Sequence, residues 1–338
     1  TRYLIIYVAI IGAVALIYNR LPTSFLPGED QGTVIVNIQL PAGATAERTV
    51  DVMKQVEDFV LKQPEVSSMV GVVGFSFSGQ GQNAALAFIT LKNWNERTKP
   101  EQHADAVAGR IMGATMNVRD AFIFALSPPP IPELGVSSGF SVRLQDRGSL
   151  GHDALVNARN TFLGMAAQSP ILAQVRPDGL EDAPQIRVEI DRDKANALGV
   201  GFDSINTTLS TAMGSAYVND FPNRGRLQRV VVQADAPSRM QPDDLLKITA
   251  SNDQGQPVPL SAFATVSWVN GAQQTVRYNG YPAMKISGAP APGYSTGEAM
   301  AEVERIISQL PEGFGYEWTG QSYEEKQAGS QSLILYSF

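Results

Sequence analysis

The sequence predicts an α+β protein, and three observations carry this prediction. Strand-like and helix-like patterns alternate in the order βαββαβ over residues 33–127, and the same order recurs over residues 140–319 around a long insertion. Of the 338 residues, 43% are hydrophobic and 17% are charged, a composition too apolar for a disordered chain. A chain of this length is expected to form more than one core.

The first alternation occupies residues 33–127. Residues 33–40 alternate apolar and polar side chains as a strand does, and residues 47–62 repeat apolar side chains on one helical face until Gln63-Pro64 ends the helix. Two strands follow, at 66–77 and 84–92, around a glycine-rich turn, and then come a helix at 103–117 and a strand at 121–127. This order is typical of the ferredoxin-like βαββαβ unit, in which helices cover one face of an antiparallel sheet.

A second ferredoxin-like unit follows, and it is interrupted. Its first half has a strand at 140–146, a helix at 153–168 and a strand at 172–176. Its second half begins with a strand at 283–288, continues with a helix after the capping box Ser295-x-x-Glu298, and ends with a strand at 316–319. The intervening residues 181–275 are predicted to form a separate α+β domain with strands at 185–190, 227–234 and 258–269 and helices at 192–197 and 203–212. Internal duplication explains the repeated unit.

Both ends of the chain are apolar. Residues 3–18 carry no charge and are bounded by Arg2 and Arg20, which predicts a transmembrane helix rather than a signal peptide, because no small-residue cleavage site follows. Residues 331–338 turn apolar again, as the start of a second membrane helix would. The predicted division is a membrane helix and interface segment at 1–28, a first unit at 29–134, a second at 135–180 with 276–325, the insert at 181–275, and the next membrane helix from 326.

Composition and motifs exclude several classes of function. The formal net charge is −7, which disfavours nucleic-acid binding, and the absence of cysteine excludes disulfides, thiolate metal sites and cysteine nucleophiles. His103 and His152 stand alone, so metal ligation is disfavoured, and the G-x-G-x-x-A match at 79–84 precedes a strand rather than the helix of a dinucleotide site. The adjacent acidic pairs are predicted to be turn or surface charges; they are Glu29-Asp30, Glu181-Asp182 and Asp243-Asp244. We therefore expect no enzyme, no metal and no cofactor.

The segment GVVGFSFSGQGQNAALAF at residues 71–88 is the most informative. Its glycines permit positive φ angles and a change of conformation, and they surround Phe75 and Phe77. Phe88, Phe122 and Phe124 lie on neighbouring predicted strands with Ile35 and Val72. The segment indicates either a partner-binding wedge, or a moving wall of an apolar pocket, or a bulged hairpin whose phenylalanines fill the core. The pattern alone does not decide among these.

Several motifs then resemble one family. They are RLPTSFLPGEDQG (20–32), QLPAGAT (39–45), ERT (47–49), GFSFSGQGQN (74–83), VRPDGLEDAPQ (175–185), INTTL (205–209), YVNDF (217–221), RYNG (277–280) and STGEAM (295–300). In this order and over nearly the whole chain, they resemble the second periplasmic half of the resistance-nodulation-division efflux pumps. The resemblance is closest to the hydrophobe/amphiphile multidrug branch typified by the acriflavine-resistance pump.

The resemblance implies a proton-driven trimeric exporter of the Gram-negative inner membrane. Its periplasmic part captures hydrophobic or amphiphilic drugs and passes them through an adaptor protein to an outer-membrane channel. The two ferredoxin-like units would be porter subdomains, and residues 181–275 a docking subdomain. No cofactor is implied, since the proton motive force drives the intact pump. The proton-relay residues of the family lie outside this chain, which therefore could not transport alone.

The resemblance also implies site residues. The distal drug pocket would be lined by Phe75, Phe77, Phe88, Ile35, Val72 and Leu86. The switch loop between the pockets would include Gly74, Ser76, Ser78, Gly79, Gln80 and Gly81. The proximal pocket would be lined by Phe124, Leu126, Leu134 and Arg176, with Asn37 near its edge.

The chain departs from the family pattern at four positions, and two other interpretations stay open. Val70 stands where a pocket Phe is common, Lys285 and Ser287 stand where an acidic and an apolar residue are expected, and Pro128 replaces an apolar residue. One alternative is a membrane-anchored protein-interaction module that uses the insert and its turn at 223–226. The other is an enzyme of unknown chemistry. The heavy-metal branch is disfavoured because the nine Met are scattered.

Overall fold

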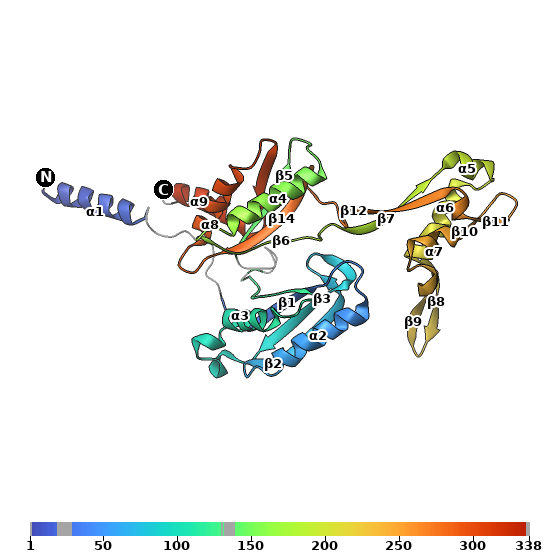
Figure 1. Ribbon diagram of the computed structural model, residues 1–338. Coiled ribbons are helices and arrows are strands. Elements are labelled where there is room, and N and C mark those ends of the chain that lie inside the picture. The colour runs from blue at the N-terminus through green and yellow to red at the C-terminus, as the bar shows by residue number, and fades with distance from the viewer. Residues whose placement is uncertain (1, 19–28, 130, 132–138, 336–338) are drawn as a thin grey trace. The chain divides into compact units, whose positions relative to one another are not determined.

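The computed structural model describes residues 2–18, 29–129, 131 and 139–335. Contacts divide the chain into two units, Thr1–Glu181 with Gln274–Phe338, and Asp182–Gln273. The first unit contains two antiparallel sheets, each covered by two helices (Figure 1). The second unit consists of paired strands and short helices around a small core of its own.

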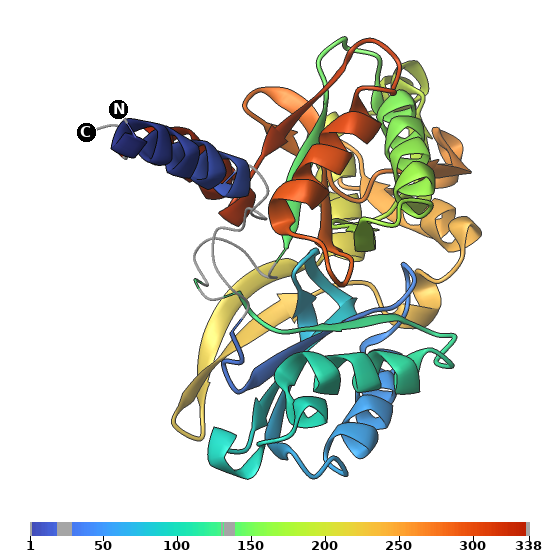
Figure 2. The same cartoon turned by 90° about the vertical axis from the view of Figure 1, so that its left-hand side faces the viewer.

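The first sheet has the strand order β2-β3-β1-β4, which is that of a split βαβ unit. Val34, Val36 and Ile38 of β1 are fully buried in a core that they share with α2 and α3. Figure 2 shows both helices on one face of the sheet. Thr45 caps α2 by accepting a hydrogen bond from the Arg48 amide. The elements in chain order are β1 (Thr33–Gln39), α2 (Ala46–Val60), β2 (Val66–Ser76), β3 (Gly79–Leu91), α3 (Ala104–Thr115) and β4 (Phe122–Leu126).

The second sheet repeats this arrangement. Its strand order is β13-β14-β5-β15, and β6 also pairs with β14, on the edge away from β5. Phe140, Val142 and Leu144, at alternate positions of β5, are buried in a core with residues of α4 and α8. These two helices lie side by side in Figure 2. The predicted capping box at Ser295 and Glu298 is confirmed. The elements are β5 (Phe140–Asp146), α4 (His152–Ala166), β6 (Leu172–Pro177), β13 (Arg277–Tyr278), β14 (Tyr281–Pro290), α8 (Thr296–Ile307) and β15 (Phe314–Trp318).

The second unit is built on the ladder between β7 and β12 and on a core around Ile205, Leu260 and Phe263. The β8–β9 hairpin is exposed along nearly its whole length. The elements are β7 (Ala183–Ile190), α5 (Arg192–Ala197), α6 (Phe202–Leu209) with a π-helical turn (Ser210–Gly214), β8 (Ala216–Asn223), β9 (Arg226–Val232), α7 (Pro242–Lys247), β10 (Thr249–Ser251), β11 (Pro257–Pro259) and β12 (Ala264–Gly271).

Two predicted boundaries are wrong. The glycine-rich residues 79–83 belong to β3 and not to a turn, because glycine keeps both backbone hydrogen-bonding groups and pairs in the ladder; Ser76 lies opposite Gly79 and Phe75 opposite Gln80. The strand predicted at 258–269 is divided by a 3₁₀ turn at Leu260–Ala262 that follows Pro259. Strand β8 and helix α7 were not predicted.

Helices also form near both ends of the chain. Helix α1 (Arg2–Tyr18) has 17 residues, and α9 runs over Gln321–Leu335. Within the described ranges, no helix combines the length and the apolar character needed to cross a membrane. The predicted interface segment at 19–28 lies outside the described residues.

Candidate functional site

The face of the first sheet that the helices do not cover is apolar. Because successive strand residues point to opposite faces, Ile35 and Asn37 of β1 lie opposite the core face of Val34 and Val36. The register places Ile35 between Phe88 of β3 and Leu126 of β4. Asn37 lies between Leu86 and Phe124 in the next row. On β2, Val70 lies opposite Phe88 and Val72 opposite Leu86.

These residues form a second apolar cluster, separate from the main core. Ile35, Leu86 and Leu126 are buried, and Phe77 and Phe124 pack against them. The structure thus brings together residues predicted for the distal pocket with two predicted for the proximal pocket. Phe88, which pairs with Ile35 of the cluster, is 38% exposed, and Phe75, two residues before Phe77, is 43% exposed. Exposed aromatic side chains that border a buried apolar cluster indicate a binding surface.

Buried polar groups hold the end of the β2–β3 hairpin on this face. The Phe77 amide donates a hydrogen bond to Asn37 Oδ1 at 3.4 Å, and Ser76 Oγ lies 3.3 Å from Gln39 Oε1. The Ser78 amide donates to Ser76 Oγ at 3.2 Å. Asn37 and Ser76 are each 1% exposed. Asn37 therefore positions Phe77 rather than presenting a free amide at the surface.

A glycine with positive φ interrupts the ladder just before the hairpin end. Gly74 has φ 99° and lies at an irregular β-bulge, where the register shifts between Val73 and Phe75 and this one residue of β2 faces four residues of β3, 81–84. A residue with a Cβ adopts this conformation only with strain. Phe75 follows Gly74 directly and pairs with Gln80 of β3.

A cavity of about 380 Å³ lies beside β4. Its walls are mostly apolar, and Arg176 of β6 provides the one charged side chain among the lining residues described. The Arg176 guanidinium lies over the Phe124 ring, 4.3 Å from its centroid, in a cation–π contact. The lining residues are Met112, Thr115, Met116, Val118, Ala121, Phe122, Ile123, Phe124, Ala125, Gln174, Val175 and Arg176.

Two of the residues predicted for the proximal pocket, Phe124 and Arg176, line this cavity. Leu126 and Asn37 share the open face of the first sheet with Phe124 but do not line the cavity, and Leu134 is outside the described residues. The sequence analysis missed Met112 and Met116 at the end of α3. Nothing in the sequence pattern singled them out, and only the fold shows that they border a cavity.

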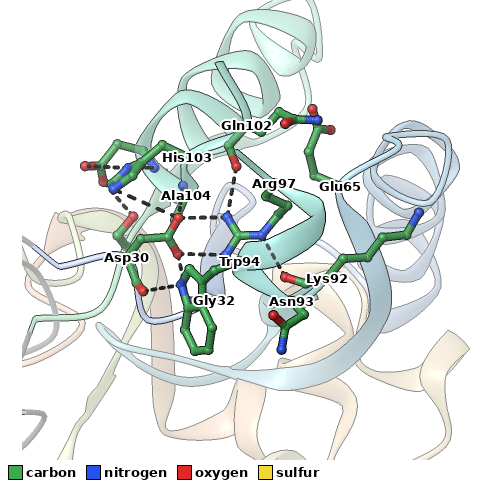
Figure 3. Close-up of polar contacts among 12 residues, drawn as sticks. Asp30, Gly32, Glu65, Lys92, Asn93, Trp94, Arg97, Gln102, His103 and Ala104 are labelled. Atoms are coloured by element: carbon green, nitrogen blue, oxygen red, sulfur yellow. Dashed lines mark hydrogen bonds and ion pairs between the residues drawn. The ribbon is translucent and has the colours of Figure 1, made fainter. Parts of the chain in front are cut away.

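The acidic residue Asp30 corrects another prediction. Expected as a turn or surface charge, it forms a buried ion pair with Arg97, with Nη1 to Oδ2 at 2.7 Å and exposed side-chain fractions of 10% and 1% (Figure 3). The amides of Gly32 and Ala104 donate to the same carboxylate. Burial alone would raise the pKa of Asp30, but the hydrogen bonds from Arg97, Gly32 and Ala104 and the charge of Arg97 outweigh it and lower the pKa to about 2. The pair joins the residues before β1 to the loop before α3.

In residues 2–18, 29–129, 131 and 139–335, no group of three or more His, Asp or Glu side chains is placed to hold a metal ion. His103 caps α3 through Nδ1, which accepts a hydrogen bond from the Asp105 amide at 3.4 Å. The apolar face of the first sheet offers apolar area and aromatic rings, and the cavity beside β4 adds polarisable sulfur and one cation, Arg176.

Comparison with known proteins gives consistent results. The family model described as the AcrB/AcrD/AcrF family matches residues 1–338. Multidrug export protein AcrF of Escherichia coli K12 is 51% identical over 342 residues, which cover 100% of this chain and 33% of that protein. The Multidrug/solvent efflux pump membrane transporter MepB of Pseudomonas putida is 50% identical over 337 residues, which cover 99% of this chain and 32% of that protein.

Multidrug resistance protein MdtF of Escherichia coli O157:H7 is 46% identical over 339 residues, which cover 99% of this chain and 33% of that protein. The chain thus spans about a third of the length of the curated relatives it matches. The match covers the whole chain at an identity far above that at which a shared fold is in question. The chain belongs to the AcrB/AcrD/AcrF family of resistance-nodulation-division multidrug efflux transporters.

Proposed function

We propose that this chain is the drug-binding periplasmic part of a proton-driven multidrug exporter of the Gram-negative inner membrane. The observation that carries the proposal is the apolar face of the first sheet, where half-exposed phenylalanines surround a buried apolar cluster. Relatives named as multidrug or solvent efflux proteins support it. Hydrophobic and amphiphilic compounds are the substrates, and an adaptor protein passes them to an outer-membrane channel.

The chemistry of the face suits varied apolar ligands. Phenylalanine and methionine offer contact area without a fixed demand for hydrogen bonds, so ligands of different shape lose little by exchanging water for these side chains. In this proposal Phe75, Phe77, Phe88, Ile35, Val72 and Leu86 serve the distal pocket. Phe124, Leu126, Leu134, Arg176 and Asn37 serve the proximal pocket.

The two sheet-and-helix units act as porter subdomains at 29–134 and at 135–180 with 276–325, and residues 181–275 act as a docking subdomain. The hairpin end from Gly74 to Gly81 acts as the switch loop between the pockets. The irregular backbone at Gly74 and the short turn allow this segment, which carries Phe75 and Phe77, to change conformation. Homotrimers form in the intact pump, the helices at the two ends belong to its membrane part, and the proton motive force replaces any cofactor.

A transport assay tests this proposal. The full-length transporter carrying Phe75→Ala together with Phe88→Ala is expressed in cells without other drug efflux, and export of the neutral dye N-phenyl-1-naphthylamine is followed by fluorescence. We expect slower export than wild type at equal amounts of protein, because both rings are removed from the binding face. Phe202→Ala is the matched control, since Phe202 is 45% exposed but lies in the second unit. Wild-type export by the double variant would refute the proposal.

A protein-interaction module is the second candidate. The β8–β9 hairpin favours it, because this two-stranded element is exposed on nearly all its residues and has little stabilisation of its own. This candidate predicts that small apolar ligands do not bind to the chain. The transport assay therefore separates the two functions.

A further inference from the structure

The end of the β2–β3 hairpin contacts a leucine from outside the first sheet. Gly79 is the first residue of β3 and follows the two-residue turn Phe77-Ser78. A Cβ atom built at Gly79 would lie 3.4 Å from Leu180 Cδ1 and 3.9 Å from its Cγ, so the leucine side chain occupies the space beside this glycine. Leu180 lies in the segment between β6 and β7, which is part of the first unit, as the hairpin is. Two segments far apart in sequence therefore meet at the hairpin end.

The segment that carries this leucine is anchored on both sides of it. On one side, the Asp178 amide donates a hydrogen bond to the Lys285 carbonyl oxygen at 2.9 Å, and the Asp178 carboxylate pairs with the Lys285 ammonium group. Ser287 Oγ donates to the same carboxylate at 3.2 Å. On the other side, Arg159 of α4 donates to both carboxylate oxygens of Glu181, at 3.0 Å and 2.8 Å. Charge-assisted hydrogen bonds of this kind are strong and fix geometry, so the segment provides a firm support.

The anchor at Asp178 depends on residues that depart from the family pattern. Lys285 and Ser287 are two of these residues, and both contact the Asp178 carboxylate. The Asp178 side chain is only 7% exposed, so the pair is largely removed from water. An acidic residue at position 285, as the family pattern leads one to expect, would repel this carboxylate instead of pairing with it. The support beside Leu180 is thus built from residues of this sequence.

The hairpin end itself is held by weak bonds. The ladder is irregular at Gly74, and two residue pairs continue it to the turn. The Phe77 amide donates to Asn37 Oδ1 at 3.4 Å, and Ser76 Oγ lies 3.2 Å from the Gly79 carbonyl oxygen. Both distances exceed the usual values for hydrogen bonds of their type. Long bonds and glycine leave conformational freedom to the backbone, and a side chain packed against it reduces this freedom.

We propose that Leu180 is a positioning residue for ligand binding: it restrains the hairpin end, so that Phe77 stays packed on the buried cluster of the apolar face. The inference rests on the proposed function and adds to it a residue that acts through the hairpin. A surface that is ordered before the ligand arrives binds more tightly, because the cost of ordering it does not reduce the binding free energy. Leu180 belongs to none of the hydrophobic cores that the described residues form, so its contact serves the hairpin rather than a core.

Two measurements on the purified full-length transporter test this role. Hydrogen–deuterium exchange followed by mass spectrometry reports on the backbone amides of residues 74–83, and fluorescence reports on the binding of N-phenyl-1-naphthylamine. We expect Leu180→Ala to exchange faster over residues 74–83 and to bind the dye about fivefold more weakly, which corresponds to ordering about one residue of backbone on binding. Leu180→Met should restore both properties to wild type, because it keeps the volume of the side chain.

Leu150→Ala is the matched control. Leu150 also lies against a glycine, with Cδ1 3.0 Å from a Cβ atom built at Gly313, but both residues lie in loops that flank elements of the second sheet and its helices. Its truncation should change neither the exchange of residues 74–83 nor the binding of the dye. Leu180→Val, which shortens the side chain less than alanine does, should give a smaller effect in the same direction. A melting temperature of Leu180→Ala close to that of wild type would verify that the fold is intact.

The outcomes separate this inference from the proposed function. If Leu180→Ala exchanges and binds the dye as wild type does, the positioning role is wrong and the proposed function stands. The role is also wrong if exchange rises without a loss of dye affinity, or if Leu180→Met behaves as Leu180→Ala does. If wild type does not bind the dye, the proposed function is wrong and the positioning role with it.

Discussion

At Asp30 a single carboxylate holds together segments that are distant in sequence. Its oxygens accept hydrogen bonds from Arg97 of the loop after β3 and from the amide of Ala104 at the start of α3. The Trp94 indole donates to the Asp30 carbonyl oxygen at 2.8 Å, so the loop is fixed on two sides. A pattern of charges cannot reveal this, because the acidic pair Glu29-Asp30 resembles any exposed turn until its partners are known.

Asp30→Asn should lower the free energy of unfolding by about 3–5 kcal/mol, because it leaves the Arg97 guanidinium buried without a counter-charge. Asp120→Asn is the control: it breaks the exposed pair with Arg48, and exposed pairs contribute little. Urea unfolding followed by tryptophan fluorescence measures both, with Trp94 reporting directly on the loop. Equal stability of the Asp30 variant and wild type would contradict the role assigned to the pair.

The same pair sets a pH dependence. The pKa of Asp30 is lowered from 3.8 to about 2 in the folded protein, so the folded state binds fewer protons than the unfolded state between these values. Its contribution, about 2 kcal/mol, is therefore complete above about pH 5 and is lost as the pH falls toward 2. In the same urea experiment, the stability difference between wild type and Asp30→Asn should narrow over this range.

At the scale of elements, the glycines of the first unit have opposite roles according to where they lie. Gly74 occupies a bulge with φ 99°, whereas Gly109 lies on the exposed side of α3, and a Cβ built at either position meets no atom within 4 Å. The two positions therefore have the same room for a Cβ atom and differ in backbone conformation. The comparison isolates the conformational requirement of the bulge.

Gly74→Ala should destabilise the protein by about 1–2 kcal/mol, since a residue with a Cβ is strained at this φ. Gly109→Ala should instead stabilise it by about 0.5–1 kcal/mol, since alanine loses less entropy than glycine on entering a helix. Thermal unfolding of the two single variants provides the measurement. A Gly74 variant as stable as the Gly109 variant would show that the bulge does not require glycine.

Element order was predictable where a hydrophobic period was strong. The core face of β1 follows from apolar residues at every second position, and the helices α2 and α8 follow from apolar residues every three to four positions. The α8 cap follows from the spacing of Ser295 and Glu298. The hairpin end was not predictable in this way. Glycine and polar residues at 79–83 have low strand propensity, yet Gly79 and Gln80 pair with β2 in the ladder.

At the scale of the whole molecule, the candidate site depends on register, which the sequence pattern leaves open. Phe88 and Ile35 were expected on neighbouring strands, and the ladder places them directly opposite each other. The pairing of Asp178 with Lys285, by contrast, joins a residue after β6 to one of β14, more than a hundred positions later in the chain. Such long-range charge relations follow from the fold and not from any local motif.

The two sheets differ in the face that their helices leave uncovered: one face is apolar and the other is charged. The first offers phenylalanine, and the second carries Arg143, Lys285 and Arg176 together with the carboxylates of Asp178 and Glu317. An amphiphile needs both kinds of contact, while a purely apolar compound needs only the first. The account therefore predicts that binding of a neutral dye depends on the first face alone.

The most direct test of that claim is equilibrium binding of N-phenyl-1-naphthylamine to the purified full-length transporter, measured by its fluorescence increase. Phe75→Ala together with Phe88→Ala should weaken binding about tenfold or more, which corresponds to about 1.4 kcal/mol of lost aromatic contact. Phe202→Ala should bind as wild type does. An unchanged affinity in the double variant would contradict the account, because the dye would then be bound without the face on which the proposed function rests.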